Sequence, residues 1–554
     1  MTFGIKGIKM KLDWLTEDAK TFLKDKYLRE GETIEQRYQT IFDTCENICK
    51  EKGIADRLKD YVEKNWLSFA TPVLRNFGAD DNLSISCNKM EVQDSLDDIL
   101  RGLHEVGIQA KYNAGTSVNF SNIRPQGSEI STGGISEGVM PFIEMYERVI
   151  SGVNQCGNRR GAMAAYLSVD HPEILSFLDI GKDKSPIKTI LPAVTVPEGW
   201  MESLKAGDLQ KRKVWAEILK MRFEKQKPYI LFLDNCNADK PKWFYDKNYE
   251  VTSSNLCSEI HGICNEDKSF ACCLSSVNLL FFDDWKDNKQ FIYDCVTFLN
   301  CVLDEYINQT EGVAGLEKSR NHAIKHRSIG LGVMGLHSYL QSKMIPFGSL
   351  IAKGLNDSVF KHIRDLAEVA TKDLTRIWGE CETTKGHGRV NDLVMAIAPT
   401  KSTGLLMGMH SIGIEPFKNN YHTKDSAGGS FSFKNPFLKK VLADKDQDVH
   451  EVWDSILDNS GSVQHLDFLT DNEKEVFKCF DEISQMDIVQ CAAIRQKHID
   501  QGQSLNLMFT PSTPIKDINK VILTAHELGV KALYYQYNSN SAQKSDISCS
   551  SCEG

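Results

Sequence analysis

Beyond residue 66, short apolar runs alternate along the chain with amphipathic stretches of helical period. This alternation is typical of α/β architecture, in which apolar runs form buried strands and amphipathic stretches form the helices that cover them. Residues 229–233, for example, predict a buried strand, and residues 214–225 predict the helix before it. The body of the protein is therefore expected to be an α/β domain.

Two later segments carry helix-end signals. The sequence Thr-Asp-Asn-Glu at 470–473 predicts a capping box that opens a helix running through Phe480. Residues 514–528 predict a helix that begins at a proline and ends before Gly529. Residues 530–537 then predict a strand.

The pattern divides the chain into three parts. Residues 1–65 are charged and helix-patterned, with glycine breaks at Gly31 and Gly53, and predict a small N-terminal helical region. Residues 66–537 are the expected catalytic body. Residues 538–554 hold six serines and almost no apolar side chain, so we expect a flexible tail.

Composition and charge exclude several classes of protein. With 554 residues, 41% of them hydrophobic and 25% charged, the chain resembles an ordinary soluble globular protein. Its net charge of −10 argues against broad nucleic-acid binding, which needs a basic face. No apolar run is long enough to span a membrane, and residues 1–20 lack the apolar region of a signal peptide. A cytoplasmic protein is expected.

Sixteen cysteines are many for a reducing compartment, where most should be buried and a few catalytic. A zinc module would need paired Cys-x-x-Cys units. Only Cys549 and Cys552 form such a unit, and Cys264, Cys272 and Cys273 have spacings unlike any zinc module. The sequence therefore predicts no metal ligands on this chain.

Asn255, Cys257 and Glu259 place an amide, a thiol and a carboxylate at every second position. On an extended backbone these side chains would project the same way and form a row of about 13 Å, at ~3.3 Å per residue. A hydrogen-bonding amide, a reactive sulfur and a base together suit chemistry on a polyhydroxylated sugar. A strand edge with one half-buried cysteine is the alternative interpretation of so short a pattern.

The Asn-x-Cys-x-Glu pattern resembles the active-site finger loop of the large, catalytic subunit of ribonucleotide reductases. The resemblance implies that Cys257 forms a thiyl radical that removes the ribose 3′ hydrogen. It also implies that Glu259 takes the 3′-hydroxyl proton and that Asn255 holds the sugar hydroxyls.

Segments 83–88 and 270–279 resemble the two redox-active cysteine strands of that family. The resemblance implies that Cys87 and Cys272 lie under the substrate, supply two electrons and close to a disulfide. Cys273 is the neighbouring alternative, but the Leu-Ser-Ser-Val-Asn that follows Cys272 matches the family spacing.

Substrate phosphate is expected to meet neutral donors. Residues 398–404 resemble the family's phosphate loop, although they lack the frame of a Walker motif and could be a plain turn. The substrate-binding set that the resemblance implies is Thr71, Ser86, Gly115, Thr400, Ser402 and Thr403.

Two glycine-rich segments, 124–138 and 155–163, resemble the family's specificity loops, which read a nucleoside triphosphate effector with Mg²⁺ at a dimer interface. Ser131 departs from the basic residue of many relatives, and two mobile surface loops are the alternative. The implied effector-binding residues are Asp94, Ser95, Leu96, Arg124, Arg159 and Arg160.

The glycines at 330, 332 and 335 fit the dinucleotide fingerprint Gly-x-Gly-x-x-Gly. The preceding segment is basic and polar, however, and no acid follows about 20 residues on, as a Rossmann unit requires. We therefore attribute these glycines to close helix packing. Residues 327–336 themselves resemble a reductase segment.

Tyr534 and Tyr535 form a pair that usually indicates cross-strand packing. In the family's class I members this pair relays a radical from a separate subunit to the active-site cysteine. Cys549 and Cys552 lie on a polar tether with a reach of roughly 20 Å, which suits a dithiol arm that reduces the Cys87–Cys272 disulfide by exchange.

The resemblance extends from about residue 27 to 554 and identifies the chain as the α subunit of a class I ribonucleotide reductase. It implies a ten-stranded α/β barrel of two antiparallel halves, each of five parallel strands, with a central finger loop. The implied partners are a second α chain, a radical-generating β subunit with a dimetal site, thioredoxin or glutaredoxin, and the ribonucleotide substrate. No cofactor on this chain is expected.

Three further points follow from this interpretation. The family's N-terminal ATP-binding module is expected to be absent, so that dATP should not inhibit through it. A reductase that uses adenosylcobalamin is one rival, and the tyrosine pair argues against it. A catalytically inactive nucleotide-binding scaffold is the other, and the complete set of reactive residues argues against that.

Overall fold

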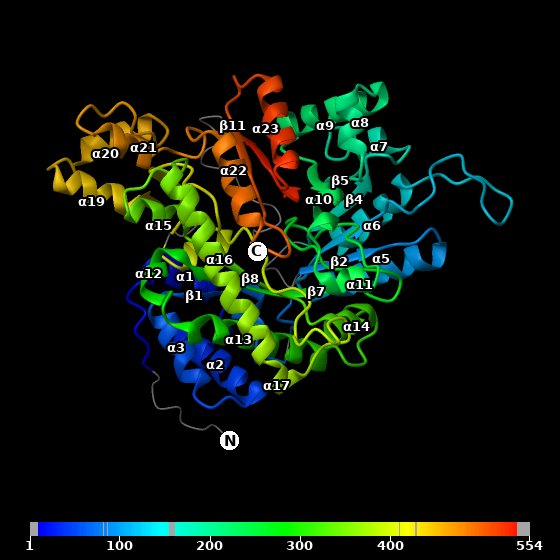
Figure 1. Cartoon of the computed structure of the whole chain (residues 1–554), viewed down its shortest axis with the longest axis horizontal. Helices are drawn as coiled ribbons and strands as arrows, with labels where there is room; N and C mark the ends of the chain where they lie inside the picture. The colour runs from blue at the N-terminus through cyan, green and yellow to red at the C-terminus, as the bar shows by residue number, and fades with distance from the viewer. Residues whose placement is uncertain are drawn as a thin grey trace.

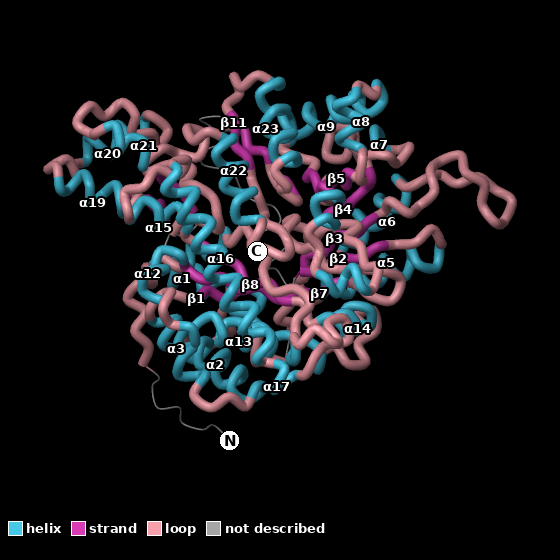
Figure 2. Tube along the Cα trace, in the orientation of Figure 1, coloured by secondary structure: helices cyan, strands magenta, loops and turns pink. Residues whose placement is uncertain are grey.

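Strands lie at the centre of the molecule and helices surround them (Figure 2). The computed structural model describes residues 9–80, 82–85, 87–153, 161–408, 410–426 and 429–539. The strands are β1 Leu67–Phe69, β2 Cys87–Glu91, β3 Gly115–Asn119, β4 Met163–Ser168, β5 Leu191–Val196, β6 Tyr229–Phe232, β7 Phe270–Asn278, β8 Ile329–Met334, β9 Tyr421–Ser426, β10 Gly429–Lys434, β11 Leu507–Phe509, β12 Ala532–Leu533 and β13 Gln536–Asn538.

Helices cover the outside of these strands (Figure 1). In chain order they are α1 Glu17–Lys26, α2 Ile34–Cys49, α3 Ile54–Glu63, α4 Thr71–Asn76, α5 Leu96–Lys111, α6 Met140–Gly152, α7 Ile174–Phe177, α8 Trp200–Ala206, α9 Leu209–Lys225, α10 Leu233–Ala238, α11 Lys242–Asp246, the 3₁₀ turn η1 Leu279–Phe281, α12 Phe282–Trp285, α13 Lys289–Gln309, α14 Glu317–His326, α15 Leu336–Ser342, α16 Leu350–Asp373, α17 Thr375–Trp378, α18 Lys401–Leu406, α19 Pro436–Asp444, α20 His450–Asp458, α21 Asp471–Val476, α22 Gln485–Gln496 and α23 Ile515–Glu527.

The first half of the central sheet is a set of five parallel strands, β2 to β6, that neighbour one another in chain order. Parallel neighbours need a crossover connection, and helices such as α5, α6 and α9 supply it. The residues of β3 and β5 are buried throughout, as expected when both faces of a strand are covered.

The second half repeats this arrangement with less regular strands. β7 pairs in parallel with β8, which bridges in parallel to Met395. Ile397 bridges in parallel to Gln503, and the chain after it, β11, pairs in parallel with β13. This half also has five segments, of which the third and fourth are held by short bridges.

The two halves meet at two antiparallel junctions, β2 with β7 and β6 with β12. Closure at both junctions produces the expected barrel of two antiparallel halves, and the fold prediction is confirmed. β1 lies outside the barrel, antiparallel to β7.

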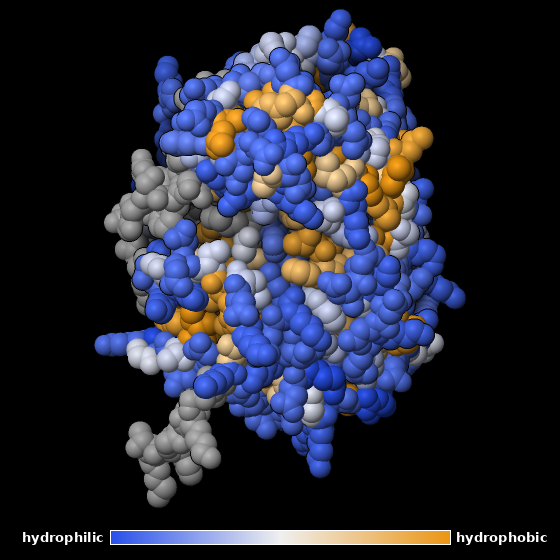
Figure 3. Space-filling model, turned by 90° about the vertical axis from the view of Figure 1, so that its left-hand side faces the viewer, coloured by the Kyte–Doolittle hydropathy of each residue, from blue (hydrophilic) through white to orange (hydrophobic). Residues whose placement is uncertain are grey.

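One large hydrophobic core joins the barrel to helices α1–α3. A smaller core lies under β9, α19, α20 and α21, and the three helices form the yellow and orange projection in Figure 1. In the part of the chain that the structure describes, no helix is long and apolar enough to cross a membrane. The face seen in Figure 3 is mainly hydrophilic, with separate apolar patches.

The expected helix-end signals hold with shifted ends. Thr470 and Glu473 form the capping box, but α21 ends at Val476 and not at Phe480. The helix predicted over 514–528 is α23, and the strand predicted over 530–537 is split into β12 and β13. The split occurs at the tyrosine pair, where the chain leaves β6 and joins β11.

The interpretation of the glycines at 330–335 as helix packing is wrong for the first two. Gly330 and Gly332 lie in strand β8. A Cβ on Gly330 would lie 2.2 Å from Leu274 Cδ2, and one on Gly332 would lie 2.7 Å from the Ala396 carbonyl oxygen. These glycines permit close approach of neighbouring strands and chain segments in the barrel wall.

Candidate active site

The segment that carries Cys257 is a tight turn inside the barrel and not the extended row expected from its spacing. Ser258 has a left-handed backbone (φ 65°), and its N–H donates to the Asn255 carbonyl oxygen at 3.2 Å. The Asn255 side-chain oxygen accepts from the backbone N–H groups of Glu259 (3.0 Å) and Ile260 (3.2 Å). These hydrogen bonds from the Asn255 side chain to its own turn stabilise a turn, and so the segment does not adopt the extended conformation that its spacing predicted.

Side chains from the first half-barrel hold the finger loop from one side. Lys89 Nζ donates to the Ser253 carbonyl oxygen (2.8 Å). The Ser117 hydroxyl donates to the Ser254 carbonyl oxygen (2.5 Å). The Tyr166 hydroxyl donates to the Asn255 carbonyl oxygen at 2.9 Å. The loop is thus fixed by strands β2, β3 and β4.

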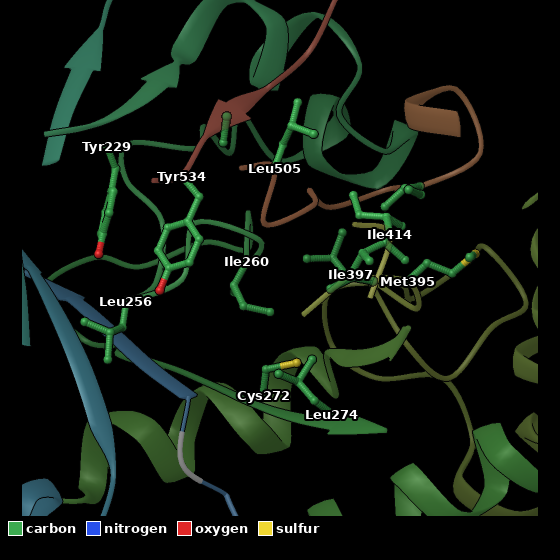
Figure 4. Packing of buried hydrophobic residues seen from close by; sticks show 14 of the residues in the cluster. Tyr229, Leu256, Ile260, Cys272, Leu274, Met395, Ile397, Ile414, Leu505 and Tyr534 are labelled. Atoms are coloured by element: carbon green, nitrogen blue, oxygen red, sulfur yellow. The ribbon is translucent and has the colours of Figure 1, made fainter. Parts of the chain in front are cut away.

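The second half-barrel contacts the loop from the other side. Figure 4 shows Ile260 of the loop between Tyr534 above it, Cys272 and Leu274 below it, and Met395 and Ile397 beside it. These residues belong to the same buried core. The turn therefore has a packed base, which leaves its tip as the part that faces the cavity.

Ser504 links the thiol residue to the carboxylate residue. Its hydroxyl lies 2.7 Å from the Cys257 carbonyl oxygen and 3.1 Å from Glu259 Oε2, and can donate to either. No motif in the sequence pointed to Ser504, which is 247 residues from Cys257.

Glu259 is a buried carboxyl group. Burial away from water raises the pKa of this carboxyl group from 4.5 to about 7, although hydrogen bonds with Asn255 and Ser504 oppose the shift. Within the described residues its Oε1 atom has no hydrogen-bond partner, while the residue lines the cavity. A carboxyl group with this pKa can exchange protons near neutral pH.

Cys87 and Cys272 are directly opposite one another on the antiparallel strands β2 and β7. Opposed residues of this kind have Cα atoms about 4.5–5.5 Å apart, within the range that a disulfide spans. Burial raises the pKa of the Cys272 thiol well above its usual value, with smaller contributions from Cys273 and Cys87. The pair can therefore be held as thiols and closed without moving the strands.

Cys273, the neighbouring alternative, points away from this pair. Its thiol donates to the Leu299 carbonyl oxygen in α13 at 3.2 Å, because successive residues of a strand face opposite sides. The structure thus brings Cys272, and not Cys273, to the side of Cys87.

A cavity joins several residues that the sequence had separated by more than 300 positions. Cys87, Cys257 and Glu259 line it together with Thr71. Of the phosphate loop, Thr400, Ser402 and Thr403 line it as well.

Three other predicted residues do not line the cavity in the part of the chain that the structure describes, namely Asn255, Cys272 and Gly115. Asn255 and Cys272 are buried, and both Cys272 on β7 and Gly115 on β3 lie opposite Cys87. Ser86, Arg159, Arg160, Cys549 and Cys552 lie outside the described residues.

Aromatic residues connect Cys257 to the second antiparallel junction. The Tyr534 hydroxyl lies 3.5 Å from the Cys257 sulfur, and the rings of Tyr534 and Tyr535 have centroids 4.4 Å apart. The ring centroids of Tyr229, in β6, and Tyr534 are 4.6 Å apart, and those of Tyr535 and Tyr537 are 5.8 Å apart. Sequence reasoning missed Tyr229 and Tyr537, although Tyr537 follows Tyr535 at the strand period.

Four of the predicted effector residues, Asp94, Ser95, Leu96 and Arg124, lie near one another at the start of α5 and the segment beside it. Arg124 Nε pairs with Asp94 at 2.7 Å, and Ser95 caps α5 by accepting from the Asp98 N–H. Leu96 is exposed beside them. The segment after Arg124 forms an exposed hairpin, the cyan loop at the right of Figure 1, closed by the bridge between residues 129 and 135.

Comparisons with known proteins agree with this architecture. The family model described as "Ribonucleotide reductase, barrel domain" matches residues 85–211, 203–383 and 370–536. The large subunit of ribonucleoside-diphosphate reductase from Invertebrate iridescent virus 3 is 30% identical, over 96% of this chain and 97% of its own length. The large chain from Schizosaccharomyces pombe is 27% identical, over 80% of this chain and 64% of its own length.

A solved structure is also similar. The class Id ribonucleotide reductase α subunit of Actinobacillus ureae is 42% identical and superposes with a TM-score of 0.91, over 98% of this chain and 100% of that one. A closed barrel of two antiparallel halves with a cysteine-bearing loop at its centre is the architecture of a radical-type nucleotide reductase. The chain belongs to the ribonucleotide reductase family.

Proposed function

We propose that this protein is the catalytic α subunit of a class I reductase that converts ribonucleoside diphosphates to 2′-deoxyribonucleotides. The observation that carries the proposal is the position of the Cys257 sulfur, which lies 3.5 Å from a phenol and lines a cavity shared with Cys87 and Glu259. Residues 66–537 form the catalytic body in this proposal, and residues 538–554 form the redox tail.

The proposed reaction begins with a thiyl radical at Cys257, which takes the 3′ hydrogen atom of the ribose. Glu259 accepts the 3′-hydroxyl proton, while Asn255 positions the sugar by holding the turn. The 2′-hydroxyl leaves as water with the proton of one thiol of the pair, and C2′ receives the hydrogen of the other as Cys87 and Cys272 give up two electrons and form a disulfide. Glu259 returns its proton to the 3′ oxygen and Cys257 returns the hydrogen atom to C3′, so that one dithiol is consumed for each water formed.

Two features support this division of roles. Cys272 has a raised pKa and stays a neutral thiol, which suits a proton donor. Glu259 has a pKa of about 7 and suits a proton acceptor in the same pH range.

The substrate phosphate is proposed to bind between Thr71 and the loop 400–403, which line the same cavity as Cys87 and Cys257. The Thr400 hydroxyl accepts from the Gly413 N–H at 2.7 Å, which fixes the turn that starts α18. Neutral hydroxyls and amides hold a phosphate without binding the product too tightly for release.

The radical is proposed to come from a dimetal β subunit and to pass through Tyr535 and Tyr534 to Cys257. The close contact of the two rings supports this path. Cys549 and Cys552 then reduce the Cys87–Cys272 disulfide and are themselves reduced by thioredoxin or glutaredoxin.

Regulation and assembly complete the proposal. A nucleoside triphosphate with Mg²⁺ binds near Asp94, Ser95, Leu96 and Arg124, at the interface of an α homodimer. Leu96 and Leu100, one turn apart on α5, and Met145 on the adjacent α6 are exposed apolar side chains that a second α chain would cover.

Turnover of a ribonucleoside diphosphate with a cognate β subunit and a dithiol tests the proposal. Wild type and Cys264→Ser, a control at a buried thiol seven residues further along, should form product, whereas Cys257→Ser should form none and still bind nucleotide. Equal product from Cys257→Ser and wild type would contradict the proposal. Turnover with adenosylcobalamin and no β subunit would instead support the cobalamin-dependent alternative.

A further inference from the structure

Three cysteines outside the active site converge in the N-terminal part of the molecule. Cys45 and Cys49 are one turn apart on α2, so they share a helix face. Cys301 faces them from α13, and its thiol lies 3.6 Å from the Cys45 carbonyl oxygen. The three sulfur atoms all lie within 4.8 Å of one another.

This cluster is closed to solvent. Cys45 and Cys301 are 0% exposed and Cys49 is 5% exposed. A disulfide would use two of the sulfurs and leave the third without a function. A single ion at the centre would use all three.

We propose that Cys45, Cys49 and Cys301 form a binding site for a soft metal ion, Cu(I), held by three sulfur atoms. Metal–sulfur bonds of about 2.3 Å in a trigonal arrangement place the sulfurs roughly 4 Å apart, so the cluster needs to contract by less than about 1 Å. Soft sulfur ligands select Cu(I) and Zn(II) among the common metal ions.

The number of ligands distinguishes these two ions. Structural zinc is bound tetrahedrally by four ligands. Among the described residues the group contains these three sulfurs and no His, Asp or Glu ligand. Three-coordinate, all-sulfur binding therefore favours Cu(I).

The position in the fold also favours a cation. Cys49 is the last residue of α2, and the C-terminal end of a helix attracts positive charge. The ion would tie α2 to α13, the helix that packs against β7 and accepts the Cys273 thiol at Leu299. It would thereby stabilise the outer side of the strand that carries Cys272.

Copper binding to the reduced full-length protein tests the proposal. Cu(I) is supplied without oxygen from a chelator-buffered complex to wild type, to Cys49→Ser and to the control Cys295→Ser, which alters another buried thiol of α13. Copper bound by the active-site and tail cysteines is common to all three proteins and cancels in the comparison.

Wild type and Cys295→Ser should retain one more equivalent of copper than Cys49→Ser and should melt at a higher temperature when copper is present. X-ray absorption should show copper bound by three sulfurs at roughly 2.3 Å in that extra site. Cys45→Ser should behave as Cys49→Ser does, which separates loss of a ligand from a folding defect of one variant.

Equal copper content and equal melting of wild type and both ligand variants would overturn the proposal. A parallel titration with Zn(II) tests the choice of ion. Tighter retention of Zn(II) than of Cu(I) by the same residues would overturn the assignment to Cu(I).

Discussion

Glu259→Gln removes a carboxyl group that the fold holds away from water. The pKa of this group is about 7 in the folded protein and 4.5 in its ordinary state, so the folded state binds its proton more tightly. Stability is therefore lost as the pH rises from about 4.5 to about 7, and the loss is complete above that range. Glutamine has the same shape and no charge, so the variant should lack this loss.

The size of the effect follows from the two pKa values. At about 1.36 kcal/mol per pKa unit, the full loss in wild type is about 3 kcal/mol, of which about 2 kcal/mol falls between pH 5.5 and pH 8.5. An unfolding entropy of about 2.1 cal/mol/K per residue gives about 1.2 kcal/mol/K for a chain of this length. The melting temperature of Glu259→Gln minus that of wild type should thus be about 2 °C larger at pH 8.5 than at pH 5.5.

Thermal melting at several pH values measures this gain, and Glu105→Gln is a matched control. Burial raises the pKa of Glu105 to about 7 as well, on α5 and away from the cavity. Both variants should show the same gain in melting temperature, because the physical cause is the same.

Turnover separates the two variants. The wild-type rate should rise with pH around about 7, because the proposed base acts as a carboxylate, and Glu105→Gln should keep this profile. Glu259→Gln should lose a factor of roughly 10²–10⁴ in rate. A pH-independent difference in melting temperature would refute the reasoning on burial, and wild-type turnover by Glu259→Gln would refute the assignment as base.

Three further predictions concern the barrel. Tyr534→Phe removes the hydroxyl that lies 3.5 Å from the Cys257 sulfur, so turnover with the β subunit should vanish. Nucleotide binding measured by calorimetry should be unchanged, and retained turnover would exclude the relay. Cys272→Ser should block repeated turnover with a thioredoxin system and Cys273→Ser should not, and the reverse result would move the redox partner. Gly332→Ala should lower the melting temperature by about 1–3 °C, because overpacking costs about 1–3 kcal/mol of folding free energy. An unchanged melting temperature would show that the barrel wall can shift to accept the methyl group.

The sequence predicted the regular parts of the fold well. Strand β6 was expected over residues 229–233 and is Tyr229–Phe232, because a continuous apolar run flanked by polar residues has few other stable positions. The irregular segments around Met395 and Gln503 were not predicted, since their pairing depends on contacts with β8 and with each other. Long-range pairing of short segments leaves no local pattern.

The same distinction applies to the site. The Asn-x-Cys-x-Glu pattern predicted a reactive trio, and two of its members, Cys257 and Glu259, line the cavity. The alternation of period two did not predict its conformation, because Asn255 bonds to its own turn. Ser504 and Tyr166 contact the finger loop from distant parts of the chain, and a lone serine or tyrosine carries no signal in one sequence. Only the closed barrel reveals them.

The two lines along which the half-barrels run antiparallel carry different chemistry. Thiols face each other across one of them, at Cys87 and Cys272, and phenols gather at the other, where Tyr229 of β6 meets Tyr534. In the proposed mechanism, oxidising and reducing equivalents therefore arrive at opposite borders of one cylinder, and the sulfur of Cys257 receives the first of them. This separation would let a radical and a dithiol serve one sugar without meeting each other first.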